Sequence, residues 1–452
     1  MVKNDKQVKS LISDYCQFQQ KCLSPFHVVD VLKASMREAG FTQLEDAGIW
    51  SLEPGASYFV THSDGKSLIA FTLGDLPPEH NGFNIACAHT DSPCLRLRLN
   101  PFASSDNLLQ VLTQYHGGLI ARTWLDRPLS LAGAVYKLPR SGKQIIVDQK
   151  ACFPVPQRAL VQSHKPVMVI PDIAIHLDRE KNRTGSIDLE TMLTAVAAVG
   201  GSFEDQQKRF WASLGLDDQE VDGFDLSLAP YFPHVAVGLD GELITGPRHD
   251  DLAMVFAIQQ GLLEAVKQVP AGKTVLAGFF DAEETGSQTS SGAASSFLPH
   301  VLRRICQSHP KYQASNQIER AFSQSFLISA DMAHAFHPSH PQKYDSNHKL
   351  LINKGIAIKE NANDRYATSG QSAAIFRGIC EAAKVPVQHY INRQDIGCGS
   401  TIGPILAALL NCLAVDVGTP MWSMHSSAET MGALDLFYAK EVMKAFFSGS
   451  KS

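Results

Sequence analysis

The sequence predicts an α/β fold in which helices flank a mixed β-sheet and a β-rich domain interrupts the chain. Apolar runs alternate with amphipathic helical segments at both ends of the sequence, as expected for buried strands and their covering helices. Between residues 94 and 236, short alternating stretches separated by turn residues indicate a small all-β unit. We therefore expect one α/β domain, split into 1–93 and 237–452, around an inserted domain at 94–236. The alternative is that this block only extends the edge of the sheet.

Composition excludes several classes of protein. The 452 residues are enough for two or three domains, and 44% hydrophobic with 19% charged residues is typical of a globular protein. The net charge of −5 without a long run of one sign argues against a nucleic-acid or membrane-surface partner. We find neither a secretory signal nor an apolar stretch of the roughly 18–20 residues that a membrane span needs. Nine cysteines without a C-x-x-C pair favour reduced thiols and a cytoplasmic enzyme.

The first half of the α/β domain is predicted to contain two helices, a hairpin and a strand. These elements are expected at residues 5–22, 27–39, 58–61 with 68–73, and 83–88. Gly40 is placed to cap the second helix. The strand is followed by His89 and Asp91, a spacing that lets the imidazole bind a metal while the carboxylate accepts its other N–H.

The inserted block is predicted to be mostly strands. Strands are expected at 95–99, 108–112, 118–123, 132–138, 144–147 and 167–170. Residues 189–199 are predicted to form a helix, and the polar segment 201–228 a surface excursion.

The second half resumes the alternation of strands and helices. Strands are expected at 274–279, 325–330, 356–359 and 412–417, and helices at 252–266, 297–305, 372–383, 401–410 and 432–448. The first of these strands runs into a turn that carries Glu283 and Glu284. Ligands gather where strands of an α/β sheet end, so this pair is placed for one carboxylate to bind a metal and the other to move a proton. A solvated acidic turn is the simpler alternative for a lone pair.

Five candidate metal ligands follow strand ends or precede helices: His89, Asp250, Glu284, Asp331 and His425. Two imidazoles and three carboxylates suit zinc or a similar divalent ion. Five ligands exceed one tetrahedral site but fit two ions that share a bridging carboxylate. Asp250, at a helix start, can present both oxygens and is the expected bridge. Glu283 then remains as the expected general base.

Several motifs occur in order over nearly the whole chain. They are His89-Thr90-Asp91-Ser92-Pro93, Pro247-Arg248-His249-Asp250, Asp281-Ala282-Glu283-Glu284-Thr285-Gly286-Ser287, Ile328-Ser329-Ala330-Asp331-Met332-Ala333-His334-Ala335, Arg365-Tyr366-Ala367-Thr368, Gly399-Ser400-Thr401-Ile402-Gly403-Pro404 and Met424-His425-Ser426. This series resembles the aspartyl aminopeptidase family of dinuclear zinc metallopeptidases, as a bacterial-type member.

The resemblance implies a role for each motif residue. His89 and Asp331 would complete one metal site, Glu284 and His425 the other, and Asp250 would bridge them. Two divalent ions per subunit are implied, zinc first, with manganese or cobalt as alternatives.

The resemblance also implies the supporting residues and the assembly. Asp91 would orient His89, and Glu283 would be the base. The inserted domain would mediate dimerisation within a homododecamer, and its His176 would reach a neighbouring subunit's active site. Substrate contacts would come from His334, Lys359 and Tyr366, with Lys359 facing an acidic side chain.

The predicted function is removal of N-terminal residues, possibly acidic ones, from peptides. Two alternatives remain open at this stage. A related dinuclear carboxypeptidase or N-deacylase would use the same centre, and an oligomeric scaffold would keep the fold without the activity.

Overall fold

The computed structural model describes residues 6–139, 155–185, 187–217, 221–266, 272–311 and 317–449. The chain forms two compact units. Unit 1 comprises Met1–Ser92 and Pro233–Ser452, and unit 2 comprises Pro93–Phe232. The expected division was at residues 94 and 236. Among the described residues, no helix is both long and apolar enough to cross a membrane.

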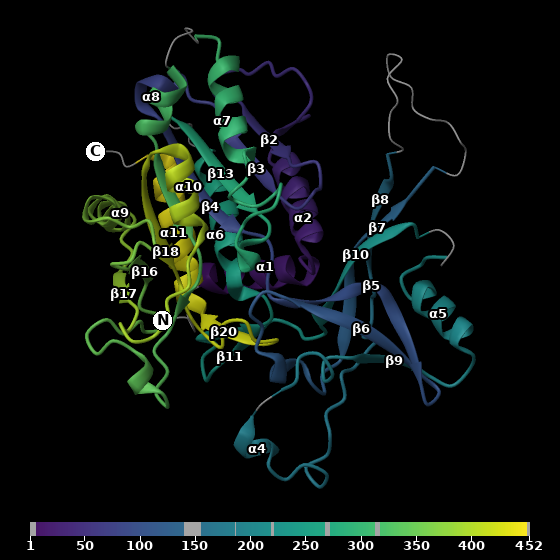
Figure 1. Ribbon diagram of the computed structural model, residues 1–452. Helices are drawn as coiled ribbons and strands as arrows, with labels where there is room; N and C mark the ends of the chain where they lie inside the picture. Colours follow the sequence, from purple (N-terminus) through teal and green to yellow (C-terminus); the bar gives the residue numbers. More distant parts are fainter. Residues whose placement is uncertain are drawn as a thin grey trace. The chain divides into compact units, whose positions relative to one another are not determined.

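A nine-stranded mixed sheet forms the centre of unit 1 (Figure 1). In spatial order its strands are β1 (Thr42–Leu44), β2 (Ser57–Thr61), β3 (Leu68–Thr72), β13 (Thr274–Phe280), β4 (Phe83–His89), β14 (Phe326–Ala330), β18 (Leu413–Gly418), β16 (Ile356–Glu360) and β17 (Val387–Ile391). β13 pairs antiparallel with β3 and parallel with β4, and β4, β14 and β18 run parallel to one another. The predicted hairpin is confirmed as the antiparallel pair of β2 and β3.

Helices cover both faces of this sheet. One hydrophobic cluster includes residues of α1 (Lys6–Lys21), α2 (Pro25–Glu38), α6 (His249–Ala265), α9 (Gly370–Ala382) and α11 (Ala433–Ser448). The other includes residues of α7 (Phe297–Ser308), α8 (Gln317–Ser323) and α10 (Ile402–Leu410). Side chains of one strand alternate between the clusters, so Phe279 joins the first and Phe280 the second. Burying each of these rings contributes about 1.5–3 kcal/mol. The predicted α/β class, a mixed sheet flanked by helices, is confirmed.

Shorter elements complete unit 1. A five-stranded sheet contains β11 (Val235–Val237), β12 (Leu243–Gly246), β20 (Glu429–Gly432), β19 (Pro420–Trp422) and β15 (Ala333–His334), and α3 covers Pro78–Asn81. This sheet has no separate signal in the sequence, because its strands are only two to four residues long. Gly40 ends α2 as expected, with φ +85° and its N–H donated to Arg37 O at 3.0 Å.

Unit 2 is built on a six-stranded antiparallel sheet. Its order is β8 (Gln157–Gln162), β7 (Leu129–Lys137), β10 (Gly223–Pro230), β5 (Cys94–Ser105), β6 (Leu108–His116) and β9 (Ala195–Val199). A hydrophobic cluster of its own includes Trp124, Phe210 and Trp211. The unit also contains the short helix α4 (Lys181–Thr184).

Three predictions inside unit 2 were wrong. Residues 189–199 do not form a helix, since β9 pairs with β6 and this pairing overrides the helical propensity of its alanines. The polar segment 201–228 is not a mere surface excursion, because it supplies helix α5 (Phe203–Ala212) and most of β10, a central strand. Residues 121–124 form a 3₁₀ turn instead of the predicted strand.

Two further predicted strands have other outcomes. Residues 167–170 make only isolated bridges, at Met168 and Val169. The predicted strand at 144–147 lies outside the described residues.

Candidate metal centre

Neighbouring strand ends of unit 1 bring the predicted ligands together. His89 is the last residue of β4, Asp331 follows β14, and the turn after β13 carries Glu283 and Glu284. These three strands are adjacent and parallel, so their carboxyl ends meet at one edge of the sheet. Asp250, at the start of α6, also reaches this edge.

Asp250 lies between two imidazoles. Its Oδ1 is 3.4 Å from His89 Nε2, and its Oδ2 is 3.2 Å from His425 Nε2. The same His425 nitrogen is 3.4 Å from Glu284 Oε2. Two ligand atoms of a tetrahedral zinc site with bonds of about 2.0–2.1 Å are separated by about 3.3 Å. The spacing of these donors therefore fits ligands of a zinc-sized ion.

In the described part of the chain, three groups of donor atoms are close enough to hold a metal ion, and two of them share Asp250. Within each group the donor atoms lie within 4.8 Å of one another. The two groups with Asp250 are Asp250, Glu284 and His425, and His89, Asp250, Asp251 and Asp331. The third group is His89, Glu283 and Glu284. The two groups with Asp250 contain the predicted ligand pairs, and Asp251 is a donor that was not among the predicted ligands.

The centre holds more buried negative charge than its protein partners neutralise. Glu284 Oε1 and Asp251 Oδ1 are buried and have no hydrogen-bond partner in the described part of the chain. Burial raises the pKa of both carboxyl groups well above the ordinary value, and the neighbouring Asp250 adds to the rise. A divalent cation would supply both the missing partner and the missing charge, so these residues fit a metal.

Asp91 fixes the Glu283–Glu284 turn. Its Oδ1 accepts the N–H of Glu283 at 3.0 Å, and its Oδ2 accepts the N–H of Glu284 at 3.3 Å. His89 Nδ1 lies 3.0 Å from the Asp91 main-chain oxygen and 3.4 Å from Oδ1. Burial raises the pKa of Glu283 to about 8, against the opposing effect of His89. Asp91 thus contacts the main chain of the predicted base Glu283 and of the predicted ligand Glu284, in addition to His89.

Lys359 contacts Asp331, one of the predicted metal ligands. Its side chain is buried, and Nζ donates to Asp331 O at 2.9 Å and to Met332 O at 3.1 Å. The same Nζ is 3.3 Å from Asp331 Oδ2 and 5.2 Å from the centre of the Tyr366 ring. Tyr366 is buried, whereas His334 is exposed. Lys359 therefore supports Asp331, a contact that the sequence did not indicate.

His176 belongs to unit 2, whereas all other predicted site residues belong to unit 1. Its side chain is exposed, as are the neighbouring Ile173 and Ile175.

Two residues of the centre were missed. The signal for Asp251 in the sequence is its position directly after Asp250. In the structure, its Oδ2 accepts the His89 N–H at 3.1 Å. Glu429 is buried and contacts the backbones of Asp250 and His425. Its position four residues after His425 carries no signal by itself.

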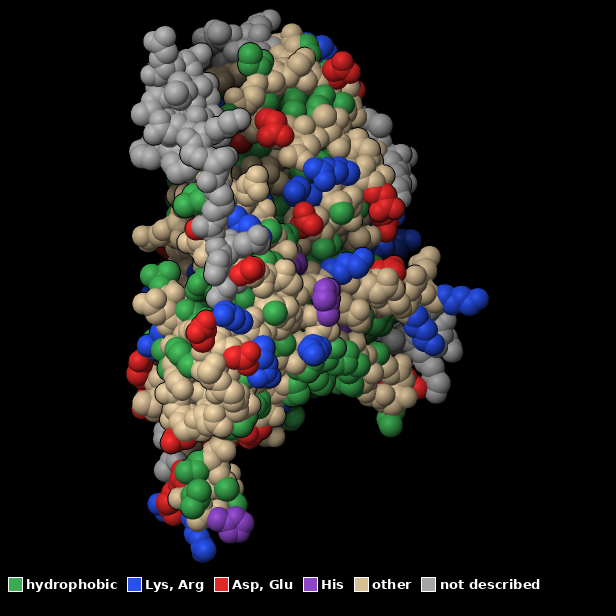
Figure 2. Space-filling model, turned by 90° about the vertical axis from the view of Figure 1, so that its right-hand side faces the viewer, with side chains coloured by type: hydrophobic (Ala, Val, Ile, Leu, Met, Phe, Trp, Pro, Cys, Tyr) green, Lys and Arg blue, Asp and Glu red, His purple; other side chains and the backbone are tan. Residues whose placement is uncertain are grey.

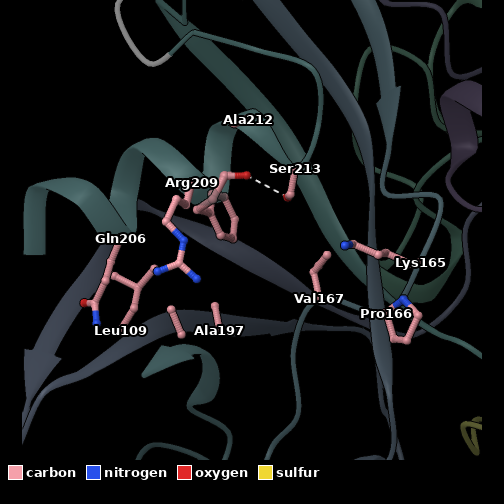
Figure 3. Close-up of a pocket in the computed structure, with 11 residues that line it drawn as sticks. Leu109, Lys165, Pro166, Val167, Ala197, Gln206, Arg209, Ala212 and Ser213 are labelled. Atoms are coloured by element: carbon pink, nitrogen blue, oxygen red, sulfur yellow. Dashed lines mark hydrogen bonds between the residues drawn. The ribbon is translucent and has the colours of Figure 1, made fainter. Parts of the chain in front are cut away.

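Two hollows lie outside the cluster of metal donors. In unit 2, a cavity of about 520 Å³ separates α5 from β6 and the segment 165–167 (Figure 3). Its lining includes Arg209, Lys165 and Phe210 but no His, Cys, Asp or Glu, so it offers no strong metal ligand. In unit 1, a hollow of about 710 Å³ is lined by Arg365 and Cys398, among others.

The fold and the donor cluster define an α/β protein with a candidate metal centre, and comparison with known proteins gives its family. The chain belongs to the aminopeptidase I zinc metalloprotease family (M18), which it matches over residues 18–447. It is 36% identical over 441 residues to a probable M18 family aminopeptidase 2 of Clostridium novyi, covering 96% of this chain and 98% of the relative. A relative of the same description from Stutzerimonas stutzeri is 38% identical, covering 95% and 96%.

Solved structures agree with this assignment. The chain matches a structure described as the Ape4 and Nbr1 complex with a TM-score of 0.91 and 33% identity, over 99% of this chain and 86% of the other. An M18 aminopeptidase from Thermotoga maritima shares the fold, with a TM-score of 0.85 at 23% identity over 98% and 97%. The protein is a zinc metallo-aminopeptidase, and the predicted family is confirmed at the level of M18.

Proposed function

We propose that the enzyme holds two divalent ions, zinc first, and uses them to remove single residues from peptide N-termini. The supporting observation is Asp250, which directs one oxygen toward His89 and the other toward His425. In this proposal His89 and Asp331 complete one site, and Glu284 and His425 complete the other. When bound, such ions polarise a carbonyl oxygen and lower the pKa of water.

Glu283 is the proposed general base. Its backbone is fixed by Asp91, and a donor oxygen of Glu283 lies within 4.8 Å of donor atoms of His89 and Glu284. The carboxylate would take a proton from the attacking water and deliver it to the leaving amine. Because Asp91 holds the main chain of both glutamates, the base keeps its position relative to the ligand Glu284.

Elemental analysis and a pair of substrates test this function. We expect two ions per chain and release of the first residue from an aminoacyl-anilide with a free amine. The matching N-acetylated anilide should not be cleaved. Cleavage of the acetylated substrate would favour the deacylase alternative, and an active sample with one ion or none would refute the dinuclear site.

We propose that unit 2 mediates self-association and that His176 completes the active site of a neighbouring subunit. Large apolar side chains are exposed on unit 2, among them Leu99, Leu177 and Val199, and Figure 2 shows hydrophobic side chains between charged ones on this side. A yeast protein of the same fold, mApe1, is described as a dodecamer, and we propose a homododecamer here. A neutral His176 could donate one hydrogen bond to the oxyanion of a tetrahedral intermediate.

We propose a preference for acidic N-terminal residues, which requires a cation near the substrate side chain. The proposed cation is Lys359, which is buried and whose Nζ lies 3.3 Å from Asp331 Oδ2. Lys359→Ala should lower kcat/KM more for Asp and Glu substrates than for Ala and Leu substrates. Faster turnover of Leu than of Asp by the wild-type enzyme would refute the preference.

A further inference from the structure

Glu429 joins the backbones of two metal-ligand residues that are distant in sequence. It is the first residue of β20, and only 1% of its surface is exposed. Its Oε2 accepts the N–H of Asp250 at 3.1 Å, and its Oε1 accepts the N–H of His425 at 2.6 Å. One carboxylate therefore links the start of α6 to the loop between β19 and β20.

The backbone of Asp250 needs such partners. Asp250 lies in the first turn of α6 with φ −81° and ψ 110°, outside the helical range. The N–H groups of a first turn have no partner within the helix. Glu429 accepts this N–H, and Ser92 Oγ donates to the Asp250 carbonyl at 2.7 Å. The main chain of Asp250 is thus held on both sides.

We propose that Glu429 is a positioning residue for the ion shared by Asp250, Glu284 and His425. The inference rests on the proposed dinuclear function. Both partners of Glu429 are N–H donors, so its site requires two acceptor oxygens. A glutamine would present one oxygen and turn its NH₂ group against the second N–H. Loss of groups that orient metal ligands typically costs about 10–100-fold in metal affinity or activity.

Asp435 provides a matched control. It is also fully buried, and its Oδ2 and Oδ1 accept the N–H groups of Asn353 at 2.5 Å and Gly355 at 2.9 Å. These partners are not metal-ligand residues. Asp435→Asn should therefore disturb the fold in a similar way without acting on the ions.

The experiment measures zinc binding to the full-length apo-enzyme by competition with a chromophoric chelator, alongside thermal unfolding. In Glu429→Gln we expect one of the two zinc affinities to fall about 10–100-fold. The other affinity should fall less, because that site shares only Asp250 with Glu429, and both affinities of Asp435→Asn should stay close to wild type. Should Glu429→Gln fail to fold, Glu429→Asp keeps the charge, shortens its reach by one methylene and should show the same selective loss.

The outcomes separate this inference from the proposal beneath it. Wild-type enzyme that binds fewer than two ions refutes the dinuclear function. Wild-type enzyme that binds two, together with a folded Glu429 variant of unchanged affinities, overturns only the role of Glu429. An equal loss in the Glu429 and Asp435 variants also overturns it, since the effect would then follow fold stability.

Discussion

Replacing Glu283 by glutamine should remove turnover while leaving the metal centre in place. The substitution preserves the size of the side chain, and the Asp91 bond goes to the main-chain N–H of Glu283, which is unchanged. The ligand groups around Asp250 keep all their proposed donors. The amide, however, cannot accept the proton that the mechanism assigns to Glu283. General acid–base catalysis contributes about 10²–10⁴-fold, or about 2.7–5.4 kcal/mol of transition-state stabilisation.

The assay measures kcat and KM on an aminoacyl-anilide together with metal content. We expect kcat to fall about 10²–10⁴-fold with KM little changed and two ions retained. Glu284→Gln is the contrast, because the proposed ligand oxygen is replaced and metal should be lost. A fully metallated Glu283→Gln enzyme with near-normal kcat would refute the assignment of the base.

Three further predictions concern the ions, the assembly and the pH dependence of stability. Asp250→Ala should reduce the metal content of both sites, whereas loss of a single ion would contradict its bridging role. His176→Ala and Glu283→Gln, each inactive alone, should regain activity in co-expressed mixed oligomers if His176 acts in a neighbour, and persistent inactivity in verified mixtures would exclude the shared site. Burial lowers the pKa of His27 from 6.5 to about 4. Between pH 4 and pH 6.5, His27 therefore binds a proton in the unfolded chain but not in the folded chain. This residue should therefore cost up to about 3 kcal/mol of stability as pH falls from 6.5 to 4, and a His27→Gln variant should lack that part of the loss in denaturant titrations.

The α/β part of the fold was predictable because its signals are local. Buried strands such as β13 are continuous apolar runs, and the long helices show apolar side chains at helical spacing. In unit 2 the same reasoning failed where pairing partners decide the structure. β10 lies between β7 and β5, yet its sequence Gly223–Pro230 carries polar and acidic residues that reduce the apolar signal. Arg96 pairs with Asp225 across these strands at 3.0 Å, a contact that only the fold reveals.

The ligand candidates were accessible from sequence because each stands next to a recognisable strand end or helix start. The distances between the ligand atoms could not be predicted from the sequence. The contact of Lys359 with Asp331 could not be predicted either, because it depends on the register of β16 against β18. Glu429 lies at the start of a four-residue strand that has no periodic signal.

The partners of each buried carboxylate provide a physical basis for dividing the centre into ligands and supports. Asp91 and Glu429 each turn both oxygens toward main-chain N–H groups. Asp250 instead turns both oxygens toward imidazole nitrogens, and Glu284 directs Oε2 toward His425 while its Oε1 has no hydrogen-bond partner among the described residues. Oxygens already bonded to N–H groups are poorly placed to bind a cation, whereas oxygens that face the nitrogens of potential imidazole ligands can share a cation with them. Two acidic residues with similar burial can therefore be assigned opposite roles from the direction of their oxygens.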